Sequence, residues 1–476
     1  MWMIGRKKEQ QILTDCLKSP RPEFITVYGR RRVGKTFLIR QFFNDRFSFY
    51  STGIADGNTR DQLKIFNNAL KEYGCPDRKI PTDWLEAFSR LKTILEKETV
   101  KRDVSGKRII FLDEVPWMDT ARSDFRRALD YFWNSWGSVQ QDLVLIVCGS
   151  ATSWIINHLT DSHGGFYNRI TRQIHLLPFT LQECEDLCKA NNIILSRLQL
   201  MEAYMVFGGI PFYLNLLNSR LSLAQNIDEL CYQENGPLRY ESKRLFSSLF
   251  KNAEKHATII RMMAEKRHGV TRKELAENSS IGNNDKLTKA LSELEQCGFI
   301  RKYKSSASAK QGFLYQLIDP FMLYSLKFLE NGELQSWIDF VGTPGYYAWR
   351  GNAFEVLCLN HIPQIKESLG IRAVGTLVYP WRSKFSSPGV QIDLLIDRKD
   401  GVINLCEMKC SNEVFVIDAQ YEKQLSNKIS VFQAETKTNK AIHLTMVTSN
   451  GLAYNEHAGN VINVISGDDL FENSNR

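Results

Sequence analysis

Hydrophobic and polar positions follow three different patterns along the chain. Up to about residue 235, short apolar runs such as 24–28 (FITVY) and 143–148 (LVLIVC) alternate with segments of helical period. That alternation is typical of a parallel sheet with crossover helices. From about 240 to 340 the pattern becomes helical and charged around one short hairpin, and from about 345 strand patterns return in mixed order. We therefore expect an α/β chain of several domains.

Composition narrows the class of protein. Of the 476 residues, 43% are hydrophobic and 24% are charged, which is usual for a soluble globular protein. The N-terminus is polar almost at once and the longest apolar runs are short, so we expect neither a signal peptide nor a membrane span. Ten cysteines without a CxxC pair indicate reduced thiols and a cytoplasmic location. The net charge of +8 permits nucleic-acid binding but does not require it.

The strongest motif is GRRRVGKT at residues 29–36, which matches the pattern GxxxxGK[ST] in full. It follows an apolar strand and opens a helical segment, which is the setting that a phosphate-binding loop requires. Gly29 and Gly34 let backbone N–H groups turn toward phosphates. Lys35 is expected to reach the β- and γ-phosphates, and Thr36 to offer its hydroxyl to Mg²⁺. The motif predicts a binding site for ATP and Mg²⁺.

A second apolar strand, IIFLDEV at 109–115, ends in two acids. We expect Asp113 in the Mg²⁺ shell and Glu114 beside the water that attacks the γ-phosphate. A pair of surface acids after a core strand is the alternative interpretation. The order and spacing after the phosphate loop favour ATP hydrolysis.

Three further polar residues are candidates for the same site. Ser150 ends the third apolar strand, where a polar side chain could sense the γ-phosphate. Arg169 and Arg172 could stabilise the transferred charge, either within the chain or from a neighbouring subunit of a homo-oligomer. Ordinary surface ion pairs explain both arginines equally well.

Several short segments occur in a characteristic order: IGRKKE at 4–9, the phosphate loop, LDEV at 112–115, the stretch 169–179 and FGGIPFYL at 207–214. Together they resemble a family of prokaryotic AAA/STAND-like P-loop ATPases that is common in archaea. The resemblance extends over essentially the whole chain. It implies a helical lid after the ATPase core, and a C-terminal nuclease-like domain of the kind that many members carry.

Residues 256–304 have three helix-like segments followed by a strand, and a second strand follows a loop rich in serine and alanine. A capping box at Thr271–Glu274 starts the second helix. Leu287, Leu291 and Leu294 form the apolar stripe of the third. This is a winged-helix pattern, in which the third helix can enter a DNA groove or, alternatively, dock a protein. Candidate phosphate contacts are Lys286, Lys289, Arg301, Lys302 and Lys304, although Glu293 and Glu295 lie on the same helix.

The C-terminal strands carry a second set of acids. GVQIDLLIDRKDGVINLCEMKC predicts a hairpin, and counting outward from a three-residue loop at 399–401 pairs Asp393 with Glu407. Lys409 lies on the same face. Two opposed carboxylates suit a shared Mg²⁺, which can activate water. Two solvated charges at a strand end are the alternative.

The D…ExK spacing, with Glu355 on a preceding helix and helix and strand following, resembles the PD-(D/E)xK nuclease superfamily. The proline usual before the first acid is absent here, because Gln391 and Ile392 precede Asp393. The resemblance implies that Asp393 and Glu407 hold the metal, with Glu355 as a further candidate ligand, and that Lys409 assists catalysis.

These patterns predict a P-loop ATPase core over residues 1–178, a helical lid over 179–238, a winged helix over 239–342 and a nuclease-like α/β domain over 343–476. We expect ATP turnover to control a DNA-directed C-terminal domain that acts as a Mg²⁺-dependent deoxyribonuclease. The alternative is a STAND-like switch, in which the same domain binds DNA or a protein partner and cuts nothing. A DNA-binding regulator without turnover fits poorly with an intact Glu114.

Overall fold

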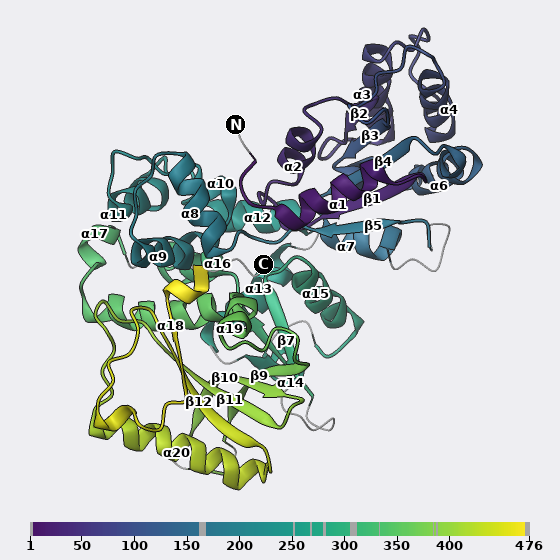
Figure 1. The fold of residues 1–476 in the computed structure, drawn as a ribbon. Coiled ribbons are helices and arrows are strands. Elements are labelled where there is room, and N and C mark those ends of the chain that lie inside the picture. Colours follow the sequence, from purple (N-terminus) through teal and green to yellow (C-terminus); the bar gives the residue numbers. More distant parts are fainter. Residues whose placement is uncertain are drawn as a thin grey trace. The chain divides into compact units, whose positions relative to one another are not determined.

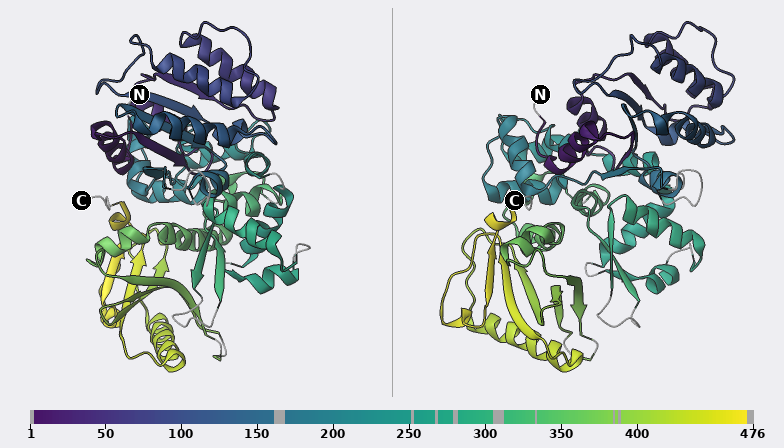
Figure 2. Two further views of the ribbon diagram at one scale, coloured as in Figure 1. Left: turned by 90° about the vertical axis from the view of Figure 1, so that its right-hand side faces the viewer. Right: turned by 45° about the vertical axis from the view of Figure 1, so that its right-hand side comes forward.

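The computed structural model of the protein describes residues 3–160, 168–250, 253–266, 269–278, 282–304, 312–332, 334–383, 385–386 and 389–471. The chain forms two compact units, Met1–Leu177 and Pro178–Arg476. Figure 1 labels their elements, and Figure 2 shows the same elements from two further sides. In the described part of the chain, no helix is both long enough and apolar enough to cross a membrane.

The first unit is built on a five-stranded parallel sheet with the strand order β2-β3-β4-β1-β5. All residues of β1, β3 and β4 are buried, because helices cover both faces of the sheet. The apolar runs of the sequence therefore became the central strands, as expected. The strands are β1 (Glu23–Tyr28), β2 (Phe49–Thr52), β3 (Arg108–Asp113), β4 (Leu143–Gly149) and β5 (Arg172–His175).

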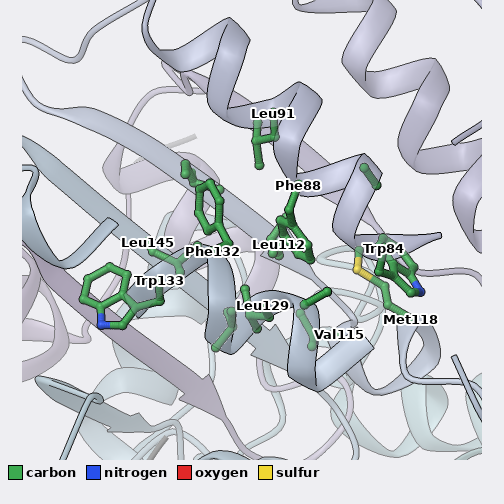
Figure 3. Packing of buried hydrophobic residues seen from close by; sticks show 14 of the residues in the cluster. Trp84, Phe88, Leu91, Leu112, Val115, Met118, Leu129, Phe132, Trp133 and Leu145 are labelled. Carbon is green, nitrogen blue, oxygen red and sulfur yellow. The ribbon is translucent and has the colours of Figure 1, made fainter. Parts of the chain in front are cut away.

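Helices and strands of this unit share one aromatic core, shown in Figure 3. Trp84 and Phe88 contribute from one helix and Phe132 from another, and the rings of Phe88 and Phe132 stack with their centroids 5.3 Å apart. The helices are α1 (Lys7–Lys18), α2 (Lys35–Phe42), α3 (Thr59–Glu72), α4 (Trp84–Leu95), α5 (Val115–Met118), α6 (Phe125–Ser135) and α7 (Thr152–Ile155).

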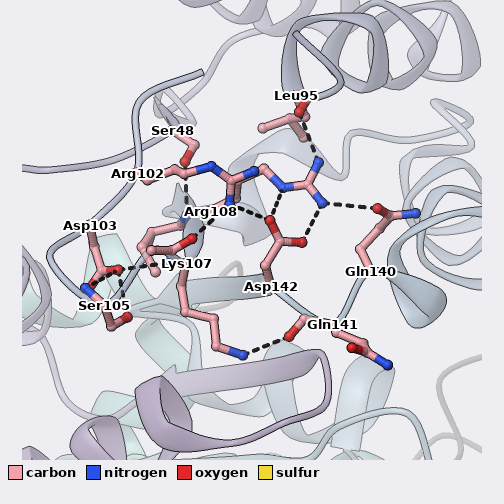
Figure 4. A network of polar contacts seen from close by, with 12 residues as sticks. Ser48, Leu95, Arg102, Asp103, Ser105, Lys107, Arg108, Gln140, Gln141 and Asp142 are labelled. Atoms are coloured by element: carbon pink, nitrogen blue, oxygen red, sulfur yellow. Dashed lines mark hydrogen bonds and ion pairs between the residues drawn. The ribbon is translucent and has the colours of Figure 1, made fainter. Parts of the chain in front are cut away.

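A network of polar contacts lies at the amino end of β3 (Figure 4). The Arg108 guanidinium donates two hydrogen bonds to the Asp142 carboxylate, at 2.8 and 2.5 Å, and one to the backbone oxygen of Leu95 at 2.9 Å. Burial would raise the pKa of Asp142, but the hydrogen bonds from Arg108 and Arg102 outweigh it and hold that pKa at about 2. The charged residues at the amino ends of the strands thus pair with one another. The loops described below lie at the carboxyl ends of the strands.

The second unit begins with helices whose connection contains the two glycines of FGGIP. Gly208 ends α9 with φ of 71°, and Gly209 follows with φ of 65°. A Cβ on Gly209 would lie 2.4 Å from the backbone oxygen of Phe179, so the close approach of the two segments requires glycine there. The helices are α8 (Leu181–Ala190), α9 (Arg197–Phe207), α10 (Pro211–Leu214), α11 (Leu223–Ile227) and α12 (Glu241–Leu249).

Three helices and a small antiparallel sheet, ordered β6-β8-β7, follow. The leucine stripe of α15 is buried, and the capping box forms, since the Thr271 N–H donates to Glu274 and the Glu274 N–H donates back to Thr271. Most of the loop expected between β7 and β8, residues 305–311, lies outside the described residues. The elements are α13 (Ala253–Glu265), β6 (Val270–Thr271), α14 (Arg272–Asn278), α15 (Asp285–Gln296), β7 (Ile300–Lys304) and β8 (Phe313–Leu317).

The C-terminal part holds a five-stranded mixed sheet ordered β13-β12-β11-β10-β9. β9, β10 and β11 are antiparallel, while β11, β12 and β13 are parallel, and α20 makes the crossover from β11 to β12. Leu425 and Phe432 of α20 belong to the hydrophobic cluster formed by this sheet, and α18 packs against β11. Figure 1 shows α20 beside the sheet. The elements are α16 (Pro320–Tyr324), α17 (Trp337–Phe340), α18 (Pro344–Asn360), α19 (Ile362–Ser368), β9 (Thr376–Arg382), β10 (Gln391–Arg398), β11 (Val402–Lys409), α20 (Ala419–Thr436), β12 (Ala441–Thr448) and β13 (Asn463–Ser466).

Candidate functional site

The phosphate-loop motif forms the turn between β1 and α2. Gly29 has φ of 147°, and a Cβ there would lie 2.2 Å from the backbone oxygen of Leu176. Gly34 has φ of 91° and is the residue directly before α2. Both positions therefore need glycine, and the first helical turn presents its N–H groups toward the loop.

The Lys35 side chain is buried and curls back over the loop. Its ammonium donates to the backbone oxygens of Gly29 and Arg30, at 3.0 and 3.1 Å. These carbonyls hold the ammonium beside the turn, where it can exchange a carbonyl for a phosphate oxygen by rotation of its stem.

Thr36 and Asp113, the two predicted Mg²⁺ ligands, are in contact. The Thr36 hydroxyl donates to Oδ2 of Asp113 at 2.7 Å. Burial raises the pKa of Asp113, and the neighbouring Glu114 adds to that effect, whereas the hydrogen bond from Thr36 lowers it. A buried carboxylate with a raised pKa gains from a nearby cation, because the cation offsets the cost of burying the charge.

Glu114 and Ser150 also come together. The Ser150 hydroxyl donates to Oε1 of Glu114 at 2.6 Å, and the Ser150 N–H donates to Oε2 at 3.2 Å. Glu114 itself has the left-handed φ of 47°, which is uncommon outside glycine and often marks a functional turn. In this structure the Ser150 side chain positions the Glu114 carboxylate, a contact that sequence reasoning did not foresee.

Sheet topology explains why these residues meet. Strands β3, β4 and β1 are neighbours, and their carboxyl ends lie at one edge of the parallel sheet. Asp113 ends β3 and Glu114 follows it, Ser150 follows β4, and the phosphate loop follows β1. Loops at the carboxyl ends of parallel strands form the usual ligand crevice of such sheets.

Arg172 lies at the other end of the sheet. It begins β5 opposite Ile25, whereas the phosphate loop follows Tyr28 at the far end of β1. Although burial opposes it, the neighbouring Ser19 and Thr171 and the charge of Arg172 lower the pKa of Glu23 at the start of β1. The expectation that Arg172 acts on the phosphates of its own chain is therefore wrong, because its strand starts at the opposite edge.

Arg169 is exposed in a turn just before β5. The preceding residues 161–167, which include the GGFY of this stretch, lie outside the described residues. Arg169 is thus not brought to the phosphate loop by its own strand either.

The second set of acids meets on the hairpin of β10 and β11. Leu394 pairs with Cys406 and Leu395 with Leu405, so the next pair in this register is Asp393 with Glu407. Burial raises the pKa of Asp393 to about 6, and the charge of Glu407 contributes to the increase. The pairs from Leu394 with Cys406 to Asp397 with Ile403 follow the register counted from the three-residue loop 399–401, and the pair of Asp393 with Glu407 is the extension of that register.

Glu407 is surrounded by donors and is 3% exposed. Its Oε1 accepts a hydrogen bond from the Tyr421 hydroxyl at 2.8 Å and lies 3.2 Å from the Lys409 ammonium. The Lys428 ammonium lies 2.6 Å from Oε2. Burial would raise the pKa of Glu407, but Lys428, Lys409 and the hydrogen bonds outweigh it and lower that pKa.

Glu355 does not complete a three-carboxylate site. It lies on α18 and lines a cavity of about 440 Å³ that α13, β8 and α16 also border. Within the described ranges, no group of three or more His, Cys, Asp or Glu side chains is placed to hold a metal ion. Asp393 and Glu407 stand as a pair, and two carboxylates with remaining positions for water suit Mg²⁺.

The basic residues of α15 and β7 have different surroundings. Lys286 and Lys289 are exposed on α15, and the Lys255 ammonium donates to the backbone oxygen of Lys286 at 2.7 Å. Arg301 donates instead to the backbone oxygen of Leu359 at 2.7 Å. Arg301 thus joins β7 to α18, and its expected role as a phosphate contact is not supported.

Two other side chains expected on this surface are also engaged. Lys302 lies over the Phe313 ring, with its ammonium 4.0 Å from the ring centre. The Glu293 Oε2 atom lies 2.8 Å from Nε2 of His256, so this carboxylate is on the inward-facing side of α15. Lys304 and Glu295 are exposed.

Lys428 is the site residue that sequence reasoning missed. It lies on α20 in line with Tyr421, Leu425 and Phe432, which occur at helical spacing and face the sheet. A lysine on the otherwise apolar and aromatic face of a helix that follows an ExK strand was the available signal.

Comparison with known proteins identifies the first part of the chain. Residues 3–217 match the model of a family described as an ATPase domain predominantly from Archaea. The chain is 24% identical over 333 residues to the uncharacterized protein MJECL04 of Methanocaldococcus jannaschii, covering 68% of each sequence.

Similar solved structures include the Walker-type ATPase PABY2304 of Pyrococcus abyssi, at 19% identity and a TM-score of 0.49, covering 68% of this chain and 96% of that one. The Aeropyrum pernix ORC2 protein in ADPNP–ADP complexes has 15% identity and a TM-score of 0.43, covering 67% and 91%. The N-terminal part of this chain, with its complete phosphate loop, carries an ATPase domain of the type found predominantly in Archaea.

Proposed function

We propose that this ATPase domain hydrolyses Mg²⁺-ATP to control a DNA-directed C-terminal domain, which is a metal-dependent deoxyribonuclease. In this proposal, residues 179–238 form a lid, 239–342 a winged helix and 343–476 the nuclease-like domain. The observation that carries the ATP half is the contact between Thr36 and Asp113 at the phosphate loop. The DNA half rests on Asp393, Glu407 and Lys409 at one end of a hairpin.

In the ATP site, each residue has a separate task. The turn at Gly29 to Gly34 surrounds the phosphates, and Lys35 contacts the β- and γ-phosphates. Thr36 and Asp113 would hold Mg²⁺, which would supply positive charge beside the phosphate oxygens. Glu114, held by Ser150, orients the attacking water and accepts its proton.

Removal of Lys35 tests the ATP half. We expect Lys35→Ala to abolish ATP hydrolysis and Glu114→Gln to bind ATP with little turnover, because binding and water activation are separate tasks. Lys64→Ala, an exposed lysine of α3, is the matched control and should hydrolyse ATP normally. Turnover by Lys35→Ala at the wild-type rate would refute the assignment.

In the C-terminal site, the chain supplies a carboxylate pair and an ammonium. Asp393 and Glu407 would hold a Mg²⁺, which supplies a hydroxide-like water and a Lewis acid at the scissile phosphate. Lys409 would bind a phosphate oxygen from the solvent side; its ammonium lies 3.2 Å from Glu407 and 35% of its side chain is exposed, which supports this role. The exposed lysines 286 and 289 of α15 are candidates for binding the DNA backbone.

A cleavage assay tests the DNA half. Wild-type protein with ATP and Mg²⁺ or Mn²⁺ should cut single-stranded, duplex or branched DNA, whereas Asp393→Asn and Lys409→Ala should not. Asp397→Asn is the matched control, because Asp397 lies on the same strand and pairs with Lys440 at 2.5 Å, away from the site. Equal inactivity of wild type and variants on all substrates would refute nuclease function.

One observation favours a second candidate, the STAND-like switch. Glu407 already has two lysines and a tyrosine around it, so the carboxylate pair is compensated without a metal. A domain of that kind would bind DNA or a protein partner in an ATP-dependent manner. DNA retention that depends on Lys286 and Lys289, with no cleavage under any condition, would support this candidate over the nuclease.

A further inference from the structure

The carboxylate pair of the C-terminal domain has a lysine that no motif assigns. Lys428 projects from the middle of the 18-residue helix α20, and its ammonium lies 2.6 Å from Oε2 of Glu407. Its charge also acts on Asp393, where it opposes the increase in pKa that burial and Glu407 cause. The Lys428 ammonium thus contacts one of the two carboxylates that the proposed function assigns to a metal and acts electrostatically on the other.

The charges of the two carboxylates and the two lysines at this site cancel. Asp393 and Glu407 supply two negative charges when ionised, and Lys409 and Lys428 supply two positive ones. Opposed like charges on paired strands are destabilising without a cation nearby, and buried ionised groups need partners. Lys428 therefore meets the same electrostatic need that a bound divalent ion would meet.

We propose that Lys428 is the resident cation of this carboxylate pair and competes with a divalent metal for it. This inference rests on the proposed metal role of Asp393 and Glu407. Entry of the ion requires the Lys428 ammonium to leave Glu407, because an ion of charge +2 beside two ammoniums would be repelled. The lysine thereby sets how tightly the site binds metal and keeps the pair neutral in the meantime.

The surroundings of Lys428 permit this movement. Its side chain is 21% exposed, and the four-carbon stem of a lysine is flexible, so the ammonium can turn toward solvent without a change in the helix. Lys409 lies on the strand itself, with its ammonium 5.1 Å from the centre of the Tyr421 ring. Displacement of Lys428 therefore leaves Lys409 in place for a phosphate.

Metal binding in the absence of nucleotide tests the inference. The full-length protein is titrated with Mn²⁺ or Mg²⁺ and followed by isothermal calorimetry and thermal denaturation. Lys428→Met keeps the stem and removes the charge, and Lys423→Met, an exposed lysine of the same helix, is the matched control. We expect Lys428→Met to bind the metal at least tenfold more tightly than wild type, a difference of about 1.4 kcal/mol.

Stability supplies a second readout. Without metal, Lys428→Met should melt at a lower temperature than wild type, because one lysine then faces two carboxylates, and the metal should restore most of the loss. If Lys428→Met does not fold without metal, Lys428→Gln keeps a hydrogen-bond donor near Glu407 and takes its place. Lys423→Met should match wild type in both measurements.

Two results would overturn the inference, and they are distinguishable. If Lys428→Met and Lys428→Gln bind metal no more tightly than wild type, and Glu407→Gln abolishes that binding, Lys428 does not compete although the metal site stands. If no variant shows a metal response that Asp393→Asn or Glu407→Gln removes, the metal site of the proposed function fails, and the inference fails with it.

Discussion

Stability of the second unit should depend on the protonation of one buried histidine. His361 lies between α18 and α19 and is 1% exposed. Its Nδ1 contacts the backbone oxygen of Leu357 at 2.8 Å, and its Nε2 accepts a hydrogen bond from the Leu181 N–H at 3.1 Å. Because Nε2 is the acceptor, the proton of the neutral ring is on Nδ1 and is donated to Leu357. Protonation of Nε2 would break the bond to α8.

The size of the effect follows from the pKa. Burial lowers the pKa of His361 from 6.5 to about 4, although the hydrogen bond to Leu357 acts the other way. A histidine with a lowered folded-state pKa contributes stability that is complete above the unfolded value and is lost as the pH falls toward the folded value. The full difference corresponds to about 3 kcal/mol, of which about 2 kcal/mol is lost between pH 7 and pH 5.

Hydrogen exchange of peptides from α8 and α18, at pH 7 and pH 5, measures the opening free energy of these segments. The comparison is between wild type and His361→Gln, whose amide can donate to Leu357 and accept from Leu181 but does not titrate. Wild type should lose about 2 kcal/mol more than the variant between the two pH values. Other titrating groups, including Asp393 with its raised pKa, are common to both proteins and cancel. An equal loss in both proteins would refute the reasoning.

Three further outcomes are expected. In thermal denaturation, Asp393→Asn should be more stable than wild type at pH 7.5 in EDTA and no more stable near pH 4. The reason is that the raised pKa of Asp393 means that its charged form destabilises the folded protein. A stability difference that does not change between these pH values would contradict the expectation. Ser150→Ala should lower kcat for ATP by roughly tenfold with little change in KM, because Glu114 loses the charge-assisted hydrogen bond from the Ser150 hydroxyl and keeps only the one from the backbone N–H. A change confined to KM would argue against the positioning role. Gly29→Ala should destabilise the first unit and abolish ATP binding, because its Cβ would lie 2.2 Å from a backbone oxygen. Gly106→Ala, with φ of 81° and open space around it, should lower the free energy of unfolding by only about 1 kcal/mol. Equal effects of the two variants in chemical denaturation would exclude the steric explanation.

The local sequence was sufficient to predict the position of a residue wherever that position depends on the residue's own strand or turn. The contact between Thr36 and Asp113 follows from two apolar strands whose carboxyl ends lie at the same edge of a parallel sheet. The pairing register of Asp393 with Glu407 follows from a three-residue loop and strict alternation along two strands. In both cases the backbone geometry of one element determines where the side chain points.

Residues whose partners come from a distant element could not be placed in this way. Arg172 follows the acidic motif in the chain and lies on a strand beside β1, but the register pairs it with Ile25, away from the end of β1 where the phosphate loop begins. Arg301 looked like a free cation on a strand, yet its guanidinium reaches the last turn of α18, 58 residues away in sequence. Lys428 was missed because its partner lies 21 residues earlier, on a strand. Long flexible side chains reach several candidate partners, and only packing between elements selects one.

The two pairs of acids differ in what compensates them, and this difference bears on how the halves of the protein would work. At the ATP site, Asp113 and Glu114 accept hydrogen bonds from the neutral hydroxyls of Thr36 and Ser150, and the Lys35 ammonium rests on backbone oxygens. Hydroxyls leave the negative charge in place, so this pair still attracts a metal ion. At the C-terminal pair, two ammoniums neutralise the charge at Glu407. If both sites take Mg²⁺, the ATP site therefore fills first, and the C-terminal site fills only after Lys428 moves, which would make it the step open to control.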